Sequence, residues 1–132
     1  MKTLALVLSI AALPPALYEV TTETRMPHLE ENLRYSTTQE RRCVAQPESL
    51  ATAFPILNHV SLKGCHLRDE SRQGNTVTYL LACEGGHGTT GHATWELSNH
   101  QMTGTLHVKL GGKNMTFYQR VTAIPVGRCE TQ

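Results

Sequence analysis

The sequence predicts a mainly β fold, an antiparallel meander of about seven strands that forms a strongly curved sheet or a small barrel. Three observations predict it. Apolar and polar residues alternate with a period of two, glycine-containing turns separate the alternating runs, and four cysteines are available to link strands. We also expect one short helix after the second strand, and two disulfides. With 132 residues, the chain has room for one domain and a short targeting segment.

The first twelve residues, MKTLALVLSIAA, have the layout of a secretory signal peptide. Lys2 supplies the positive charge, an apolar run follows, and Ala11 and Ala12 are small residues suited to cleavage. The run is far shorter than the roughly 18 to 20 residues that span a bilayer, which disfavours a membrane anchor. It is also short for a signal peptide, so a start upstream of Met1 stays open. We expect cleavage near Ala11 or Ala12 and one periplasmic domain over residues 13–132, with no membrane span.

Alternation predicts the first two strands at residues 17–26 and 35–44. The string PESLATAFPIL that follows predicts the one helix. Pro47 suits a first turn, apolar residues recur at helical spacing as far as Phe54, and Pro55 ends the helix.

The four cysteines favour two disulfides, because an even number is typical of small exported domains; they are Cys43, Cys65, Cys83 and Cys129. A hairpin folded about Gly74 places Cys65 opposite Cys83, within the Cα distance that a disulfide needs. Cys43 is then paired with Cys129 by elimination. The same register sets Leu67 against Leu81, Asp69 against Tyr79, and Ser71 against Val77.

Two further turns organise the C-terminal half. A turn at Asn99-His100 sets Trp95 against Gly104, where the indole fills the space that the missing side chain leaves. Gly111-Gly112 is typical of a two-residue hairpin turn. Folding about it pairs Val108 with Met115, Leu106 with Phe117, Gly104 with Gln119, and Met102 with Val121. Both registers place apolar residues on the same face of the sheet.

Five segments in order are PPALYEVTTET, RRCVAQPESL, GCHLRDESRQGNTVTYLLACEGG, MTGTLHVKL and GRCE. Together they resemble a bacterial exported family known as domain of unknown function 3617. The resemblance covers essentially the whole chain after the leader, and its most specific part is the cysteine hairpin. The resemblance implies export and a small β fold. The family has no established activity, so the resemblance assigns no catalytic residue.

Seven histidines suggest a metal site. His92 and His107 are expected opposite each other on the outward face of adjacent strands, where two imidazoles can share zinc or copper. His66 is expected in the same row two strands away, and His87 on a neighbouring glycine-rich loop. The alternative is that these histidines belong to a solvated sheet face, in which case no cofactor is expected.

The inward face suggests a ligand cavity. Tyr18, Tyr79, Trp95 and Phe117 would line it for a small apolar molecule, with Gln119 as a polar contact. The alternative is a filled core, in which the Gln119 amide needs hydrogen-bond partners.

The composition disfavours nucleic-acid binding, because the formal net charge is +1 and the basic residues are scattered. Catalysis is disfavoured as well. There is no GxSxG motif, the thiols are expected in disulfides, and adjacent Asp69 and Glu70 would point to opposite faces of a strand. We therefore expect a non-enzymatic periplasmic protein that binds a protein partner or a small ligand. The alternative is a metal-binding protein that uses His92 and His107. The sequence does not define the oligomeric state.

Overall fold

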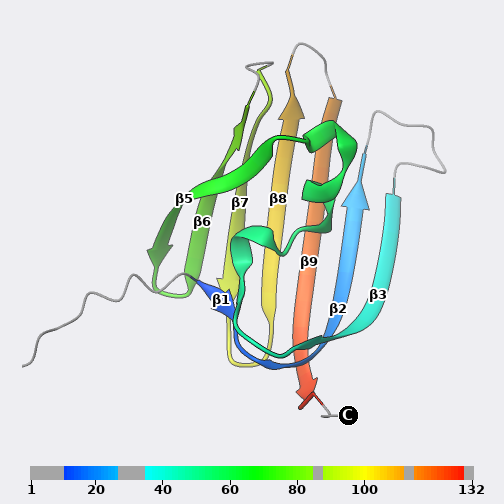
Figure 1. Cartoon of the computed structure of the whole chain (residues 1–132), viewed down its shortest axis with the longest axis vertical. Helices are drawn as coiled ribbons and strands as arrows, with labels where there is room; N and C mark the ends of the chain where they lie inside the picture. Colours follow the sequence, from blue (N-terminus) through cyan, green and yellow to red (C-terminus); the bar gives the residue numbers. More distant parts are fainter. Residues whose placement is uncertain (1–10, 27–34, 85–87, 112–114, 130–132) are drawn as a thin grey trace, which may run out of the picture.

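The protein is built on one seven-stranded antiparallel sheet, as Figure 1 shows. The computed structural model describes residues 11–26, 35–84, 88–111 and 115–129. The strands are β1 (Ala12–Leu13), β2 (Ala16–Arg25), β3 (Tyr35–Val44), β4 (Glu48–Ser49), β5 (Cys65–Gln73), β6 (Thr76–Cys83), β7 (Thr90–Leu97), β8 (Met102–Leu110) and β9 (Met115–Gly127). Their order in the sheet is β3-β2-β9-β8-β7-β6-β5, and β1 pairs with β4 in a separate two-stranded sheet.

The predicted helix after the second strand is wrong. Three short 3-10 helices stand there instead: η2 (Leu50–Thr52), η3 (Pro55–Asn58) and η4 (Val60–Leu62). Pro55 explains the interruption, because a residue before proline is disfavoured in the helical region. Phe54 accordingly has an extended backbone with ψ 110°. This segment, residues 50–62, is called the covering segment below. Figure 1 shows it in green, crossing in front of β8 and β9.

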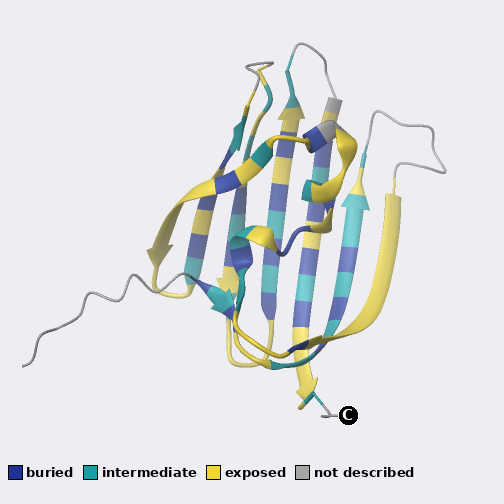
Figure 2. Ribbon diagram, in the orientation of Figure 1, coloured by how far each residue is buried: buried dark blue, intermediate teal, exposed yellow. Residues whose placement is uncertain are grey.

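The small-barrel alternative is also wrong. Among the described residues the edge strands β3 and β5 pair with β2 and β6 and not with each other, so the sheet is open. The covering segment explains why closure is unnecessary. It buries the apolar face of the sheet with its own side chains, chiefly Leu50, Phe54, Ile56 and Leu62. Figure 2 shows buried positions alternating with intermediate or exposed ones along the central strands.

Trp95 lies at the centre of this core and is fully buried. Its indole N–H donates to the carbonyl of Leu50 at 3.2 Å, and its ring lies 5.3 Å from that of Phe54. On the sheet side it lies opposite Gly104, as expected. These contacts attach the covering segment to β7 and β8.

Gln119 provides a second attachment from β9. Its Oε1 accepts from the backbone N–H of Ile56 at 3.1 Å, and its Nε2 donates to Thr24 at 2.9 Å. The amide is 2% exposed, so both of these bonds satisfy groups that water does not reach.

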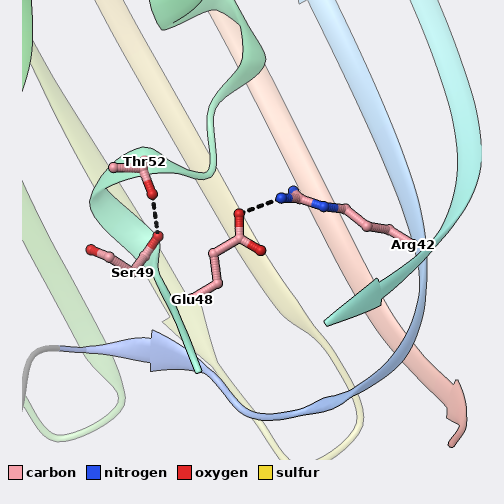
Figure 3. Close-up of polar contacts among 4 residues, drawn as sticks. All are labelled: Arg42, Glu48, Ser49 and Thr52. Carbon is pink, nitrogen blue, oxygen red and sulfur yellow. Dashed lines mark hydrogen bonds and ion pairs between the residues drawn. The ribbon is translucent and has the colours of Figure 1, made fainter. Parts of the chain in front are cut away.

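The start of the covering segment is also held by polar contacts, drawn in Figure 3. Arg42 of β3 forms an ion pair with Glu48 of β4, and the Thr52 hydroxyl donates to the Ser49 carbonyl at 3.0 Å. The Ser49 hydroxyl accepts from the N–H of Ala51, which caps η2. Edge strand β3 is thereby linked to the segment that crosses the sheet.

Both disulfides are confirmed. Cys65 is bonded to Cys83 across β5 and β6, and Cys43 is bonded to Cys129 between β3 and the chain that follows β9. None of the helices that the structure describes has the length and apolar composition that crossing a membrane requires.

The predicted registers are confirmed in part. The pairs Leu67 with Leu81 and Trp95 with Gly104 are observed, but two stretches are shifted. In β5 a bulge at Asp69 and Glu70 places Ser71 opposite Thr78. Between β8 and β9 the strand pairs begin at Leu110 with Met115, so the connection is longer than the expected two-residue turn. Val108 therefore lies opposite Phe117, and Leu106 opposite Gln119. That shift is two residues, an even number, so the predicted inward and outward faces survive.

Gly104→Ala tests the packing at Trp95. A Cβ at this glycine would lie 2.5 to 2.7 Å from three indole atoms, and the indole has no room to move. We expect the free energy of unfolding to fall by about 1–3 kcal/mol in a chemical denaturation experiment. Gly127→Ala is the matched control, because nothing lies within 4 Å of the added atom. Equal stability of the two variants would contradict this account of the core.

Candidate functional site

The uncovered face of the sheet carries a continuous line of side chains that we call the outer-face row. The row contains one residue from each strand of the seven-stranded sheet, and each residue lies opposite the next on the neighbouring strand. From β3 to β5 these residues are Tyr35, Arg25, Tyr118, His107, His92, Leu80 and Arg68. Alternation along each strand explains the placement, since successive side chains point to opposite faces. Neighbouring residues such as Tyr79, Ala93 and Leu106 point inward and are buried.

The rings in the middle of this row are in mutual contact. The imidazoles of His92 and His107 lie 5.0 Å apart and are nearly parallel, with 17° between their planes. Tyr118 meets His107 edge-on at 4.7 Å. The guanidinium of Arg25 lies 5.8 Å from the centre of the Tyr118 ring and 5.6 Å from that of Tyr35. Five neighbouring strands therefore present an unbroken line of aromatic, imidazole and cationic groups.

A groove of about 490 Å³ lies along this row, over strands β6 to β9. Its side chains include Leu80, Thr90, His92, His107, Lys109 and Tyr118. Leu80 is 54% exposed, which is high for a leucine and leaves apolar surface open at one end of the groove. The volume lies within the range of small-molecule sites, although this groove is open to solvent.

The charges around the groove are of one sign. None of the ten described residues that line it is acidic, whereas Lys109 is cationic and two histidines can become so. In the adjacent row of outward residues, Glu23 lies opposite Arg120 and forms an ion pair with it at 3.6 Å. Partial burial, and then the neighbouring His92, lower the pKa of His107 from its ordinary value of 6.5. At neutral pH, His107 is therefore a neutral ring with one N–H donor and one acceptor.

The structure places the predicted metal residues as expected only in part. His92 and His107 do lie opposite each other on the outward face. His66 lies opposite Ala82, outside the row, and the row position on β5 belongs to Arg68. His87 lies outside the described residues. Among those described, no group of three or more His, Cys, Asp or Glu side chains is placed to hold a metal ion.

The five predicted cavity residues are brought together on the other face. Tyr18, Tyr79, Trp95, Phe117 and Gln119 are between 0% and 4% exposed. Trp95 and Gln119 bond directly to the covering segment, and Tyr18 donates to the carbonyl of Pro14 at 2.6 Å. Trp95 and Gln119 thereby hold the covering segment on the sheet.

Tyr118 and Lys109 were missed by sequence reasoning. The register predicted for β8 and β9 set Thr116 against His107, and the two-residue shift places Tyr118 there instead. Had the connection after Leu110 been predicted two residues longer, the register would have placed Tyr118 opposite His107. Arg25 and Tyr35 face each other on β2 and β3, and the row reaches them only because β2 also pairs with β9. Since β2 and β9 are distant in the sequence, local patterns did not predict that pairing.

Comparisons with known proteins identify a family and nothing beyond it. A family model described as "Protein of unknown function (DUF3617)" matches residues 13–129. No curated protein and no solved structure gives a match.

The histidine pair can be tested by NMR titration. We expect His107 to titrate below 6.5, and His92→Ala to raise its pKa only part of the way, because burial is the larger cause and remains. Between the lowered pKa of His107 in the folded chain and the ordinary value of 6.5 in the unfolded chain, the unfolded chain binds more protons. The contribution of neutral His107 to the free energy of unfolding is therefore fully present above about pH 6.5 and is lost as the pH falls through the folded-state pKa. His100→Ala, in the turn after β7, is the control and should leave the titration unchanged. A value for His107 at or above 6.5 would show that the imidazoles are not packed as described.

Proposed function

The chain belongs to the DUF3617 family, and we propose that it is an exported, non-enzymatic binding protein whose ligand occupies the groove on the outer-face row. The ligand class that fits is a small molecule with a planar apolar part and an anionic group. The observation that carries the proposal is the groove lined by Lys109, the two imidazoles and Tyr118, with no acidic residue among its described lining and with the exposed Leu80 at one end.

Export to the periplasm is supported by the cysteines. Disulfides persist in oxidising compartments, and here one joins edge strand β5 to β6 while the other joins edge strand β3 to the chain that follows β9. The signal-peptide pattern over residues 1–12 points the same way, although residues 1–10 lie outside the described structure. The same disulfides use all four thiols, which supports a binding role over catalysis by a cysteine nucleophile.

The planar part of the ligand is inferred from the rings. Tyr118 and the stacked imidazoles present a surface on which a flat apolar group can stack, and Leu80 extends it. The anionic part is inferred from Lys109 and the imidazole N–H groups, which donate hydrogen bonds that a carboxylate or phosphate accepts. A protein partner, the alternative occupant, would have to cover the outer-face row beyond the groove.

Binding can be measured by NMR with benzoate and phenyl phosphate as probes and benzyl alcohol as the uncharged comparison. We expect shifts confined to β6 through β9. We also expect affinity for the anions to fall about tenfold, equivalent to about 1.4 kcal/mol, in Lys109→Ala and in Tyr118→Ala. Thr103→Ala, on β8 and outside the groove, is the control. Equal binding of benzyl alcohol would remove the anionic requirement. Shifts on other strands would move the site elsewhere.

A metal site at His92 and His107 is the second candidate, favoured by the 5.0 Å separation of the rings. The nearly parallel planes require one ring to rotate before both nitrogens can reach the same ion. Isothermal titration with Zn²⁺ and Cu²⁺ tests it. A metal held by this pair should be lost in His92→Ala and retained in His66→Ala. Saturable binding that survives His92→Ala would exclude the pair, and no binding would exclude the metal class.

A further inference from the structure

The bulge in β5 gives Glu70 an orientation that regular alternation would not. Arg68 pairs with Leu80 and Ser71 pairs with Thr78, so Asp69 and Glu70 together lie opposite the single residue Tyr79. Asp69 has a positive φ of 58°, the only such value among the described non-glycine residues. Bulges of this kind re-aim a side chain. Here the Glu70 carboxylate reaches the hydroxyl of the inward-facing Tyr79, which donates to Oε1.

The other donor to this carboxylate is the backbone of Ala11. Its N–H lies 3.1 Å from Oε1 and 3.4 Å from Oε2 of Glu70. Ala11 is 3% exposed, its carbonyl accepts from the N–H of Leu50 at 3.1 Å, and β1 begins at the next residue. The first residue described in the chain is therefore held against the sheet and the covering segment.

In the described part of the chain, the Glu70 carboxylate accepts from two neutral donors, the Tyr79 hydroxyl and the Ala11 N–H. Among the described residues no Lys or Arg forms an ion pair with Glu70. Arg72 lines the hollow beside Ala11 and Ala12, but its Nε donates to the carbonyl of Gly74. Glu48, opposite Leu13 in β4, is paired with Arg42. A cation placed where the Ala11 N–H now lies would form a stronger, charge-assisted bond.

We propose that Glu70, together with Tyr79, is the binding site for the α-ammonium group that cleavage after Ala11 creates at Ala12. The proposal rests on export as set out above. Cleavage hydrolyses the Ala11–Ala12 peptide bond: water supplies the hydroxyl of the new Ala11 carboxyl group and one proton to the Ala12 nitrogen, and the proton released when the carboxyl group ionises converts the amine to the ammonium.

The geometry allows the exchange. Consecutive Cα atoms are about 3.8 Å apart, so the Ala12 nitrogen has to move by no more than about that distance to reach the position that the Ala11 nitrogen held beside Glu70. The departing residue removes one donor from Glu70, and the new amino group supplies up to three. Ser9 and Ala11 are also the small residues that the cleavage pattern requires at the third and first positions before the cut. The bulge thus orients the Glu70 carboxylate toward the position at which the processed chain would carry its α-ammonium group.

The sign of the pH effect follows. An ion pair with Glu70 raises the pKa of the amine above its ordinary value of about 8. The stabilisation is therefore fully present below about pH 8 and is lost as the pH rises through the folded-state pKa.

The test uses the protein exported with its own leader. Intact-mass spectrometry should give a chain that starts at Ala12 with both disulfides formed. The pH dependence of acylation of its α-amine then reports the pKa of that group. We expect it to be raised in the wild type and to return to the ordinary value in Glu70→Gln. Glu84→Gln, an exposed carboxylate at the far end of the β5–β6 hairpin, is the matched control and should titrate like the wild type.

Each other outcome overturns the inference in a recognisable way. A processed chain that starts elsewhere, or an amine with the ordinary pKa in the wild type, contradicts the Glu70 site and leaves export standing. A chain that is never processed contradicts export and the Glu70 site together. The wild-type titration decides the point even if Glu70→Gln does not fold.

Discussion

The attachment of the covering segment to Trp95 is the contact on which the rest of the structure depends. The indole fills the space over Gly104, packs at a tilt against the Phe54 ring and donates to the Leu50 carbonyl, so one side chain joins two strands to residues 50–62. Because that segment buries the apolar face, the sheet can remain open with two edges. None of the described segments packs on the opposite face, which carries the outer-face row and its groove.

The two faces consequently have different roles. On the covered face, aromatic and amide groups satisfy one another and the backbone of the covering segment, which fixes the geometry of strands β7 to β9. On the open face, residues that alternate with those core positions form the outer-face row. The positions of His92, His107 and Tyr118 are thus set by the packing of their buried neighbours, and the groove is supported by a rigid sheet instead of a loop.

The polar network around Glu70 connects Ala11, the residue before β1, to the same framework. Ala11 contacts both Glu70 of β5 and Leu50 of the covering segment, and the Cys65–Cys83 bond ties β5 to β6 at the opposite end of the hairpin. Edge strand β3 is tied down by the Cys43–Cys129 bond and by the ion pair between Arg42 and Glu48. Both edges of the open sheet are therefore linked to other elements, which limits fraying of the sheet.

By itself the sequence determined the mainly antiparallel fold, both disulfides and the facing of the strands, except in β5 beyond its bulge. These depend on local alternation and turn residues, and the facing tolerates a register error of two residues, as the β8–β9 pair shows. Only the tertiary structure decided the rest: that residues 50–62 break into 3-10 turns across the sheet, that a bulge re-aims Glu70, and that Tyr118 and Arg25 join the histidines. The physical reason is that these features arise from contacts between residues far apart in the chain. The free energy of such contacts depends on tertiary packing and cannot be read from local alternation or turn residues.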